Sequence, residues 1–139
     1  MNRLEAMLIR HEGLRLKPYN DTVGKLTIGV GRNLDDVGIS EREAMVLLSS
    51  DILQAKTSAA KIFWPEFESL NEARQSALID MAFNLGEGKL RGFKSMIAAI
   101  KNGDFDFAAS HALDSKWATQ VGHRANEIAE MLRTGEWQQ

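Results

Sequence analysis

The chain has 139 residues but no cysteine, and it contains no long hydrophobic run. Without cysteine it can form neither a disulfide framework nor a thiolate metal site. No apolar stretch approaches the roughly 20 residues of a membrane-spanning helix, and the N-terminal MNRLEAMLIRHEG is too charged for a signal peptide. We therefore expect synthesis in the cytoplasm, no stable membrane insertion, and a separate route of release towards any target outside the membrane.

The chain also lacks an excess of one charge, because 17 basic residues face 19 acidic ones. A dedicated nucleic-acid-binding domain is usually strongly basic, so we expect no nucleic-acid partner. His11, His111 and His123 show no metal-ligand spacing. His11 and Glu12 begin like a zinc-protease motif, but Arg15 stands where its second histidine belongs, so no metal site is predicted.

The remaining composition predicts one folded domain over residues 1–139. Apolar residues make up 44% of the chain, which is enough for a core, and long charge runs and repeats are absent. Leu4, Met7 and Leu8 recur at helical spacing, so a helix is expected over residues 2–12, ending at Gly13.

A change to alternating residues after Leu14 predicts a β-hairpin. In KLTIGVG, apolar residues alternate with Thr27 and glycines, and Gly24 is suited to the hairpin tip. A hairpin folded about Gly24 places Asp21 opposite Thr27. Directly opposed side chains share one face of the sheet, with Cβ atoms about 4.5–5.5 Å apart.

Helices are predicted for most of the chain after this hairpin. Ser40 and Glu43 form a capping box, and an apolar stripe then continues to about residue 62, before Trp64 and Pro65 break the helix. Asn71 can cap a strongly apolar central helix that ends at Gly86. Shorter helices are expected at about 89–100, 104–113 and 123–132. The fold class is therefore α+β and predominantly α-helical.

Glu12, Asp21 and Thr27 together suggest glycoside hydrolysis. Two carboxyl groups across a cleft are the chemical groups that this reaction requires. Glu12 at a helix end suits the proton donor if it is partly desolvated, whereas Asp21 near a polar turn suits the group that stays ionised. Thr27 can hold a water beside Asp21, which favours attack from the far face of the sugar and inversion.

Three long segments resemble the T4-like phage lysozyme family. They are LIRHEGLRLKPYNDTVGKLTIGVGRNL, SLNEARQSALIDMAFNLGEGKLRGFKSM and DFDFAASHALDSKWATQVGHRANEIAEMLRTGEW. The first segment contains the family's spacing of site residues, in which eight residues separate a glutamate from an aspartate and five residues separate that aspartate from a threonine. The resemblance implies a muramidase that cleaves the β-1,4 bond between N-acetylmuramic acid and N-acetylglucosamine, with Glu12 as proton donor, Asp21 and Thr27 positioning water, and no metal or cofactor.

The same resemblance implies a lysozyme-like two-lobed fold and further site residues. A small β-containing lobe would comprise about 13–38, a connecting helix 40–62, and a helical lobe 66–139 together with 1–12. Arg124 matches a basic residue near the catalytic glutamate and would tune its electrostatics. Residues at positions that line the family's saccharide cleft are Asn33, Phe83, Gly86, Phe93, Met96 and His111.

Two departures from the family pattern stand close together. Only DDVGI separates Leu34 from Ser40, where longer members place more sheet-lobe chain, so one wall of the cleft is expected to be lower. Arg32 occupies a position where histidine is common.

The expected partner is the peptidoglycan glycan strand, the protein is expected to be a monomer, and the site of action is periplasmic peptidoglycan after release from the host cytoplasm. Two alternatives remain open: a lytic transglycosylase acting on the same bond, and a non-catalytic peptidoglycan-binding or structural phage module.

Overall fold

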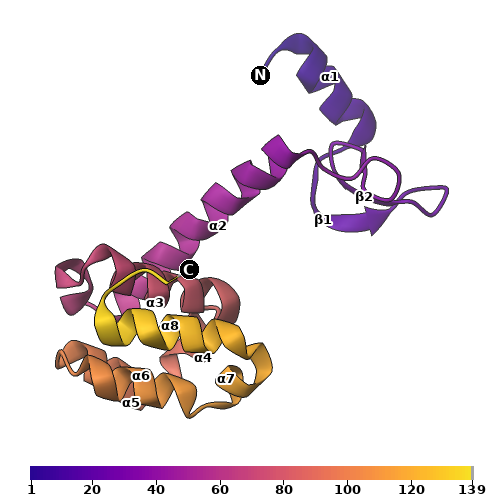
Figure 1. Cartoon of the computed structure of the whole chain (residues 1–139). Coiled ribbons are helices and arrows are strands. Elements are labelled where there is room, and N and C mark those ends of the chain that lie inside the picture. The colour runs from indigo at the N-terminus through magenta and orange to yellow at the C-terminus, as the bar shows by residue number, and fades with distance from the viewer. Residues whose placement is uncertain (139) are drawn as a thin grey trace. The chain divides into compact units, whose positions relative to one another are not determined.

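The computed structural model describes residues 1–138 and confirms a mainly helical α+β protein with one small antiparallel sheet. The chain divides into two compact units, Met1–Leu47 and Leu48–Gln139. Helix α2 (Glu41–Ile62) starts in the first unit and ends in the second (Figure 1). No helix in the described part of the chain is both long and apolar enough to cross a membrane.

The first unit consists of helix α1, a three-stranded sheet and the start of α2. Helix α1 (Arg3–Glu12) begins with a capping box between Asn2 and Glu5 and ends at Gly13, whose φ is 81°. Strands β1 (Arg15–Asn20), β2 (Leu26–Gly29) and β3 (Arg32–Asn33) follow in the order β1-β2-β3. Because β2 is the central strand, its Thr27 is only 3% exposed.

The predicted pairing of Asp21 with Thr27 is wrong, since Thr27 lies opposite Tyr19. The Asp21 amide donates to the Lys25 carbonyl at 2.9 Å, which makes Thr22–Gly24 a three-residue loop. Gly24, with φ 83°, closes this loop at its third position rather than forming the tip. The pairing therefore moves by two residues. A shift of two keeps Asp21 and Thr27 on one face as diagonal neighbours, roughly 7–8 Å apart.

Arg32 fastens the short loop before α2. Its Nη1 donates to the Gly38 carbonyl at 3.1 Å and to Glu43 Oε1 at 2.9 Å, and its Nη2 lies 2.8 Å from Glu43 Oε2. Glu43 also accepts from the Ser40 amide, while the Ser40 hydroxyl accepts from the Glu43 amide, so the predicted capping box is confirmed. Arg32 thus ties strand β3 and its loop to the first turn of α2.

This pair makes the stability of the loop depend on pH. The hydrogen bond from Arg32, with those from Ser40, lowers the pKa of Glu43 to about 2. A lowered pKa in the folded state stabilises the fold above the ordinary pKa of 4.5, and the gain disappears as pH falls through about 2. We expect Glu43→Gln to lower Tm near neutral pH, with the difference from wild type shrinking below about pH 4. A difference unchanged from pH 7 to pH 2, measured by thermal unfolding, would contradict this origin.

The second unit is a helical bundle around one apolar core. Helix α6 (Phe105–Leu113) packs against both α5 (Lys94–Lys101) and α8 (His123–Thr134), and α8 packs against α3 (Glu72–Leu85), as Figure 1 shows. The turn η1 (Glu66–Ser69) and the short helices α4 (Glu87–Arg91) and α7 (Lys116–Val121) complete it. Its largest fully buried side chains are Phe63, Phe67, Leu78, Met81, Leu90, Met96, Ile100 and Leu132.

Two helix predictions in this unit need correction. The helix expected at about 89–100 is divided into α4 and α5, because Phe93 adopts φ −80° and ψ 57° and interrupts the helical backbone. Its ring meets Trp117 edge-to-face, with centroids 6.0 Å apart. Helix α7 was not predicted. It has only six residues, so an apolar period is not visible, although the Ser115 hydroxyl caps it by accepting from the Ala118 amide at 3.1 Å.

Arg74 links the start of α3 to the end of α8. Its Nε donates to the Leu132 carbonyl at 2.8 Å and its Nη2 to the Arg133 carbonyl at 3.0 Å. The guanidinium carbon also lies 3.6 Å from the centroid of the Phe105 ring. These bonds satisfy carbonyls that the last turn of a helix leaves free.

We expect Arg74→Ala to lower the free energy of unfolding by about 2–3 kcal/mol, because charge-assisted bonds to two carbonyls and an aromatic contact are lost together. Urea unfolding of the purified protein measures this loss. The matched control is Arg91→Ala, which removes an exposed ion pair with Glu87 and should cost less than about 1 kcal/mol. If both variants lost the same free energy of unfolding, the Arg74 contacts would stabilise the protein no more than an exposed ion pair does.

Candidate active site

Glu12 is the last residue of α1, and its exposed side chain lies against the loop between β2 and β3. A Cβ placed on Gly31 would be 2.8 Å from Glu12 Oε2 and 3.2 Å from its Cδ. Gly31 also has φ 69°, a conformation that favours glycine. The carboxyl group therefore occupies the space that a side chain at Gly31 would need.

A surface hollow surrounds this carboxyl group, and we call it the acid hollow. It has a volume of about 430 Å³. Its lining residues are Glu5, Leu8, Ile9, Glu12, Val30 and Gly31. Within residues 1–138, no hydrogen bond or ion pair holds the Glu12 carboxylate. Most of the residues that line the hollow around this acid are apolar or glycine.

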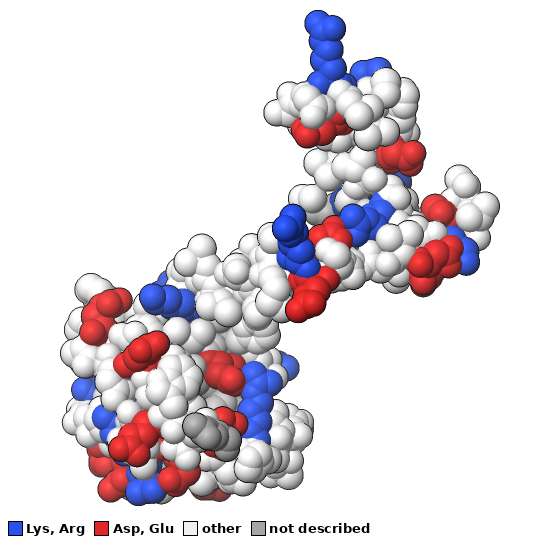
Figure 2. Space-filling view, turned by 45° about the horizontal axis from the view of Figure 1, so that its top comes forward, with Lys and Arg blue, Asp and Glu red and all other residues white. Residues whose placement is uncertain are grey.

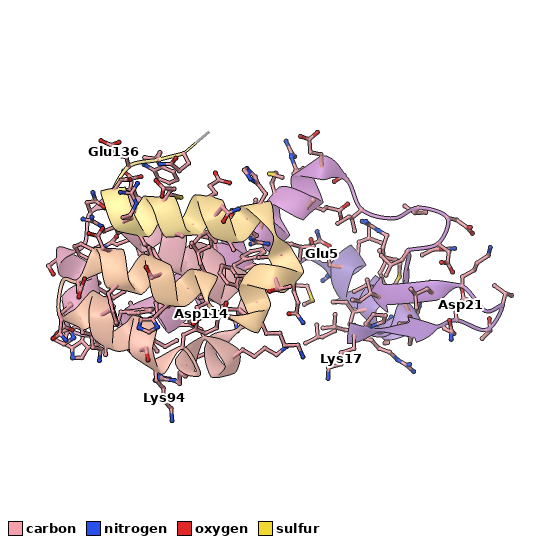
Figure 3. The ribbon with its side chains drawn as sticks, turned by 60° about the horizontal axis from the view of Figure 1, so that its bottom comes forward. Glu5, Lys17, Asp21, Lys94, Asp114 and Glu136 are labelled. Atoms are coloured by element: carbon pink, nitrogen blue, oxygen red, sulfur yellow. The ribbon has the colours of Figure 1, made fainter. Side chains whose placement is uncertain are left out.

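Asp21 begins the turn at the end of the hairpin, where Figure 3 shows it. Its Oδ1 accepts from the amides of Val23 at 2.9 Å and Lys25 at 2.8 Å. The side chain is thereby held in one orientation by the backbone of its own turn. These contacts use a single carboxylate oxygen, and no hydrogen bond to Oδ2 is found among the described residues.

Thr27 places its hydroxyl on the same face of the hairpin. Its Oγ1 donates to the Lys25 carbonyl at 2.8 Å. A hydroxyl has one proton to donate and two lone pairs to accept with. Since the proton is already used, Thr27 can act towards a further group only as an acceptor. Lys25 therefore contacts both residues, through its amide to Asp21 and its carbonyl to Thr27.

Asn33 uses its side chain within its own loop. Its Nδ2 donates to Asp36 Oδ2 at 3.0 Å and its Oδ1 accepts from the Asp36 amide at 2.9 Å. Asp35 extends the sheet by accepting from the Leu26 amide at 2.7 Å. The structure therefore gives Asn33 a role in ordering the short loop, and its predicted contact with substrate stays a prediction.

The predicted binding residues of the second unit line two separate hollows. Phe83, which is 44% exposed, and Gly86 line a hollow of about 410 Å³ between α2 and α3, together with Asp51 and Glu87. Phe93, Met96 and His111 line another of about 560 Å³, which we call the α5–α7 hollow. Met96 is only 1% exposed and belongs chiefly to the core beneath it.

Arg124 at the start of α8 forms an ion pair with Asp80 of α3. Its Nε and Nη2 both lie 2.8 Å from Asp80 Oδ1. This pair lies beside a hollow of about 380 Å³ that Ile79 and Phe83 also line. Within its own unit Arg124 is thus held by an acid, and its predicted influence on Glu12 stays a prediction.

Sequence reasoning missed two residues that position others. Gly31 was treated only as part of the alternating GVG pattern, and its contact with Glu12 depends on the path of the chain between two strands. Asn84 accepts from the Trp117 indole at 2.7 Å, across 33 positions of sequence. A glycine pair beside a strand is a signal for close backbone approach, whereas nothing local indicates the Asn84 contact.

The first unit thus carries an acid at a helix end, followed by an acid and a threonine on one hairpin face. A model of the Phage lysozyme family matches residues 9–133, and the chain belongs to this family. The chain is 31% identical to the pre-baseplate central spike protein Gp5 of Enterobacteria phage T4 over 95% of its own length, but it spans only 28% of that protein.

Two further relatives match over most of their length. A probable T4-type lysozyme 2 of Dictyostelium discoideum is 24% identical, over 97% of this chain and 96% of the relative. An endolysin of Acyrthosiphon pisum secondary endosymbiont phage 1 is 29% identical, over 81% of this chain and 75% of the relative.

Proposed function

We propose that the protein is a peptidoglycan muramidase that lyses bacteria, in the manner of a phage or prophage endolysin. It hydrolyses the β-1,4 bond between N-acetylmuramic acid and N-acetylglucosamine with inversion, and it acts on peptidoglycan after release from the host cytoplasm. The observation that carries this proposal is the arrangement of Glu12 against Gly31, with Asp21 and Thr27 on one face of the hairpin in the same unit. Family membership supports the same reading.

Glu12 is the general acid of the proposed reaction. It donates its proton to the glycosidic oxygen as the bond to the sugar carbon breaks, which lets the leaving group depart as an alcohol. No cation in the first unit pairs with this carboxyl group. Gly31 leaves the space beside its Cα open to the carboxyl group, which lies there.

Asp21 and Thr27 together orient the attacking water. The water donates one hydrogen bond to Asp21 Oδ2 and one to Thr27 Oγ1. Thr27 Oγ1 can only accept, because its own O–H already donates to the Lys25 carbonyl. A lone pair of the water then remains for the sugar carbon. Asp21 takes the proton as the new C–O bond forms, and attack opposite to the leaving group inverts the configuration.

Substrate binding is proposed for residues of both units. Phe83, Gly86, Phe93 and His111, which line hollows of the helical unit, are proposed to contact the substrate, and Met96, which also lines one of these hollows, is proposed to support it. Asn33 shapes the loop of the first unit that borders the site. Arg124 is proposed to tune the electrostatics of the acid, because a nearby cation favours the carboxylate over the carboxylic acid. No cofactor or metal takes part in the proposed reaction.

A lytic transglycosylase is the nearest alternative, because it cleaves the same bond. That reaction closes a 1,6-anhydro ring within the sugar and needs one acid but no positioned water. It would leave the Asp21 turn and the donor-saturated Thr27 hydroxyl without a role. A non-catalytic module would likewise have no use for an acid placed so closely on Gly31.

The mass of the released muropeptides tests the proposal most directly. Purified protein is incubated with isolated peptidoglycan, and the products are examined by mass spectrometry. We expect reducing sugars that have gained one water, with the α-anomer formed first when the reaction is followed by NMR. Products that lack this water would identify a transglycosylase, and no products at all would identify a binding module.

A further inference from the structure

We propose that Tyr19 is a positioning residue of the proposed reaction, and that it keeps the Thr27 hydroxyl bonded to the Lys25 carbonyl. Its ring, which Arg15 holds in place, encloses the Thr27 side chain. The proposal rests on the proposed function and adds a residue to it. It also separates two roles for an aromatic residue at this place, support of a neighbouring side chain and stacking on a sugar.

The first observation is the burial of Thr27. It is only 3% exposed, and it is the one buried residue of the first unit, Met1–Leu47, all of which the structure describes. Burial of a hydroxyl is unfavourable unless the group is hydrogen-bonded. The bond of 2.8 Å from Thr27 Oγ1 to the Lys25 carbonyl meets this requirement. The first unit thus encloses a polar side chain while its apolar side chains stay half-buried or exposed.

Two side chains flank Thr27 across the sheet. Tyr19 of β1 and Asn33 of β3 lie directly opposite it, so all three share one face. Along β2 the next residue on this face is Gly29, where an added Cβ would meet nothing within 4 Å. Tyr19 is the larger of the two flanking residues, and it is the one half-buried residue of β1, whose other residues are exposed. The ring of Tyr19 is therefore the main cover on the β1 side.

The second observation is that an irregularity of β1 brings Arg15 onto this ring. Between the pairs that Arg15 and Tyr19 form with β2, strand β1 has three residues where β2 has one. Such a bulge bends its strand and re-aims side chains, and Pro18 within it has no amide to leave unpaired. The Arg15 guanidinium carbon lies 4.2 Å from the centroid of the Tyr19 ring, within the range of a cation–π contact.

This contact favours support of Thr27 over stacking on a sugar. A ring face that is covered by a guanidinium group is not free to stack on a sugar. Figure 2 shows basic and acidic side chains interspersed over the first unit, which does not mark a surface for one sign of ligand charge. The contact of Arg15 with Tyr19 is therefore best explained as a support that fixes the ring beside Thr27.

Enclosure matters to the reaction because a hydroxyl can donate as well as accept. In the proposed mechanism the attacking water donates to Thr27 Oγ1, and a lone pair of the water remains for the sugar carbon. If the hydroxyl proton turned towards this water, it would occupy that lone pair and slow the attack. Solvent that reached the Lys25 carbonyl would compete for the bond that prevents this turn. The Tyr19 ring keeps such solvent out.

Hydrolysis of soluble glycan strands by the full-length protein tests the proposal. We expect Tyr19→Ala to lower kcat about tenfold and to change KM less than about twofold, because the loss concerns the attacking water rather than the binding of sugar. Tyr19→Phe keeps the ring and should have a kcat within about twofold of the wild type. Arg15→Ala leaves the ring in place without its support and should lower kcat about two- to threefold.

Ile28→Ala is the matched control. Ile28 is half-buried like Tyr19, but it follows Thr27 in β2 and its side chain points to the opposite face of the sheet. It should lower Tm about as much as Tyr19→Ala and leave kcat unchanged. An equal loss of kcat in both alanine variants would overturn the proposal, because general weakening of the sheet would explain it. A raised KM with unchanged kcat in Tyr19→Ala would also overturn it and would make Tyr19 a sugar contact.

NMR of protein labelled at its threonine methyl groups measures the enclosure without any reaction. A soluble gadolinium chelate broadens the signals of exposed methyl groups. In the wild type and in Tyr19→Phe, the Thr27 methyl should be broadened far less than that of Thr22, which is exposed in the hairpin turn. In Tyr19→Ala its broadening should approach that of Thr22. Equal broadening of Thr27 in wild type and Tyr19→Ala would overturn the proposal even if kcat falls.

The two measurements separate this proposal from the proposed function. If the wild type and Tyr19→Ala cleave strands with the same kcat, the muramidase assignment stands and the positioning role of Tyr19 is wrong. If the wild type cleaves no strand but the Thr27 methyl becomes exposed only in Tyr19→Ala, the muramidase assignment is wrong and the enclosure of Thr27 by Tyr19 stands.

Discussion

Replacing Glu12 by glutamine is expected to slow peptidoglycan hydrolysis by roughly 10²- to 10⁴-fold, the usual contribution of a general acid. Glutamine has nearly the same shape but no acidic proton, so the leaving sugar must depart without protonation. Solubilisation of purified peptidoglycan by wild type and variant at equal concentration measures the effect.

The variant should fold as the wild type does. In residues 1–138 the Glu12 carboxylate makes no hydrogen bond or ion pair that the amide could lose, so the free energy of unfolding should change by less than about 0.5 kcal/mol. Glu41→Gln, the same change at an exposed position in the first turn of α2, should leave activity unaltered and cost at most about 1 kcal/mol of stability through the helix dipole. Equal rates for wild type and Glu12→Gln would remove Glu12 from the reaction.

The sequence was sufficient where a signal and its partner lie within one turn. The Ser40–Glu43 capping box and the Asn71 cap were predicted and are present, because a capping side chain acts on an amide only three residues away. The glycine at the end of α3 was predicted for the same reason. The fold class followed from these helices together with one alternating segment.

Sequence reasoning failed where two conformations were locally equivalent. Gly24 suits the tip of a two-residue turn as well as the last position of a three-residue loop, and the Asp21 side chain decides between them by accepting from the Val23 and Lys25 amides. The break at Phe93 likewise depends on Trp117, 24 positions later in the chain, against which its ring packs. Neither contact is visible in a local pattern.

The candidate site shows the same division. The residue types and spacing of Glu12, Asp21 and Thr27 were visible in the sequence, and so was their shared hairpin face, because a shift of two residues preserves it. The contact of Glu12 with Gly31 was not visible, since it joins a helix end to a loop that two strands place there. The types of the candidate residues can be read from a short stretch of sequence, whereas the position of the Glu12 carboxyl group depends on how the whole first unit folds.

Gly31→Ala is expected to reduce peptidoglycan hydrolysis by about 10²-fold, since a displacement of about 1 Å in a catalytic group can have that effect. The added Cβ would lie 2.8 Å from Glu12 Oε2 and 3.3 Å from its Cγ. The flexible Glu12 side chain must therefore move away from its position. The loss should appear in kcat more than in KM, because the acid acts on the transition state.

Gly29→Ala separates this displacement from backbone strain. Gly29 has φ 70° and Gly31 φ 69°, so alanine should be strained equally at both, at about 1–2 kcal/mol of stability. A Cβ on Gly29, however, would meet nothing within 4 Å. We therefore expect both variants to lose similar stability in urea unfolding and only Gly31→Ala to lose most of its kcat. If the two variants lost activity equally, general strain in the β2–β3 loop would explain the loss, and Gly31 would have no particular role in placing the acid.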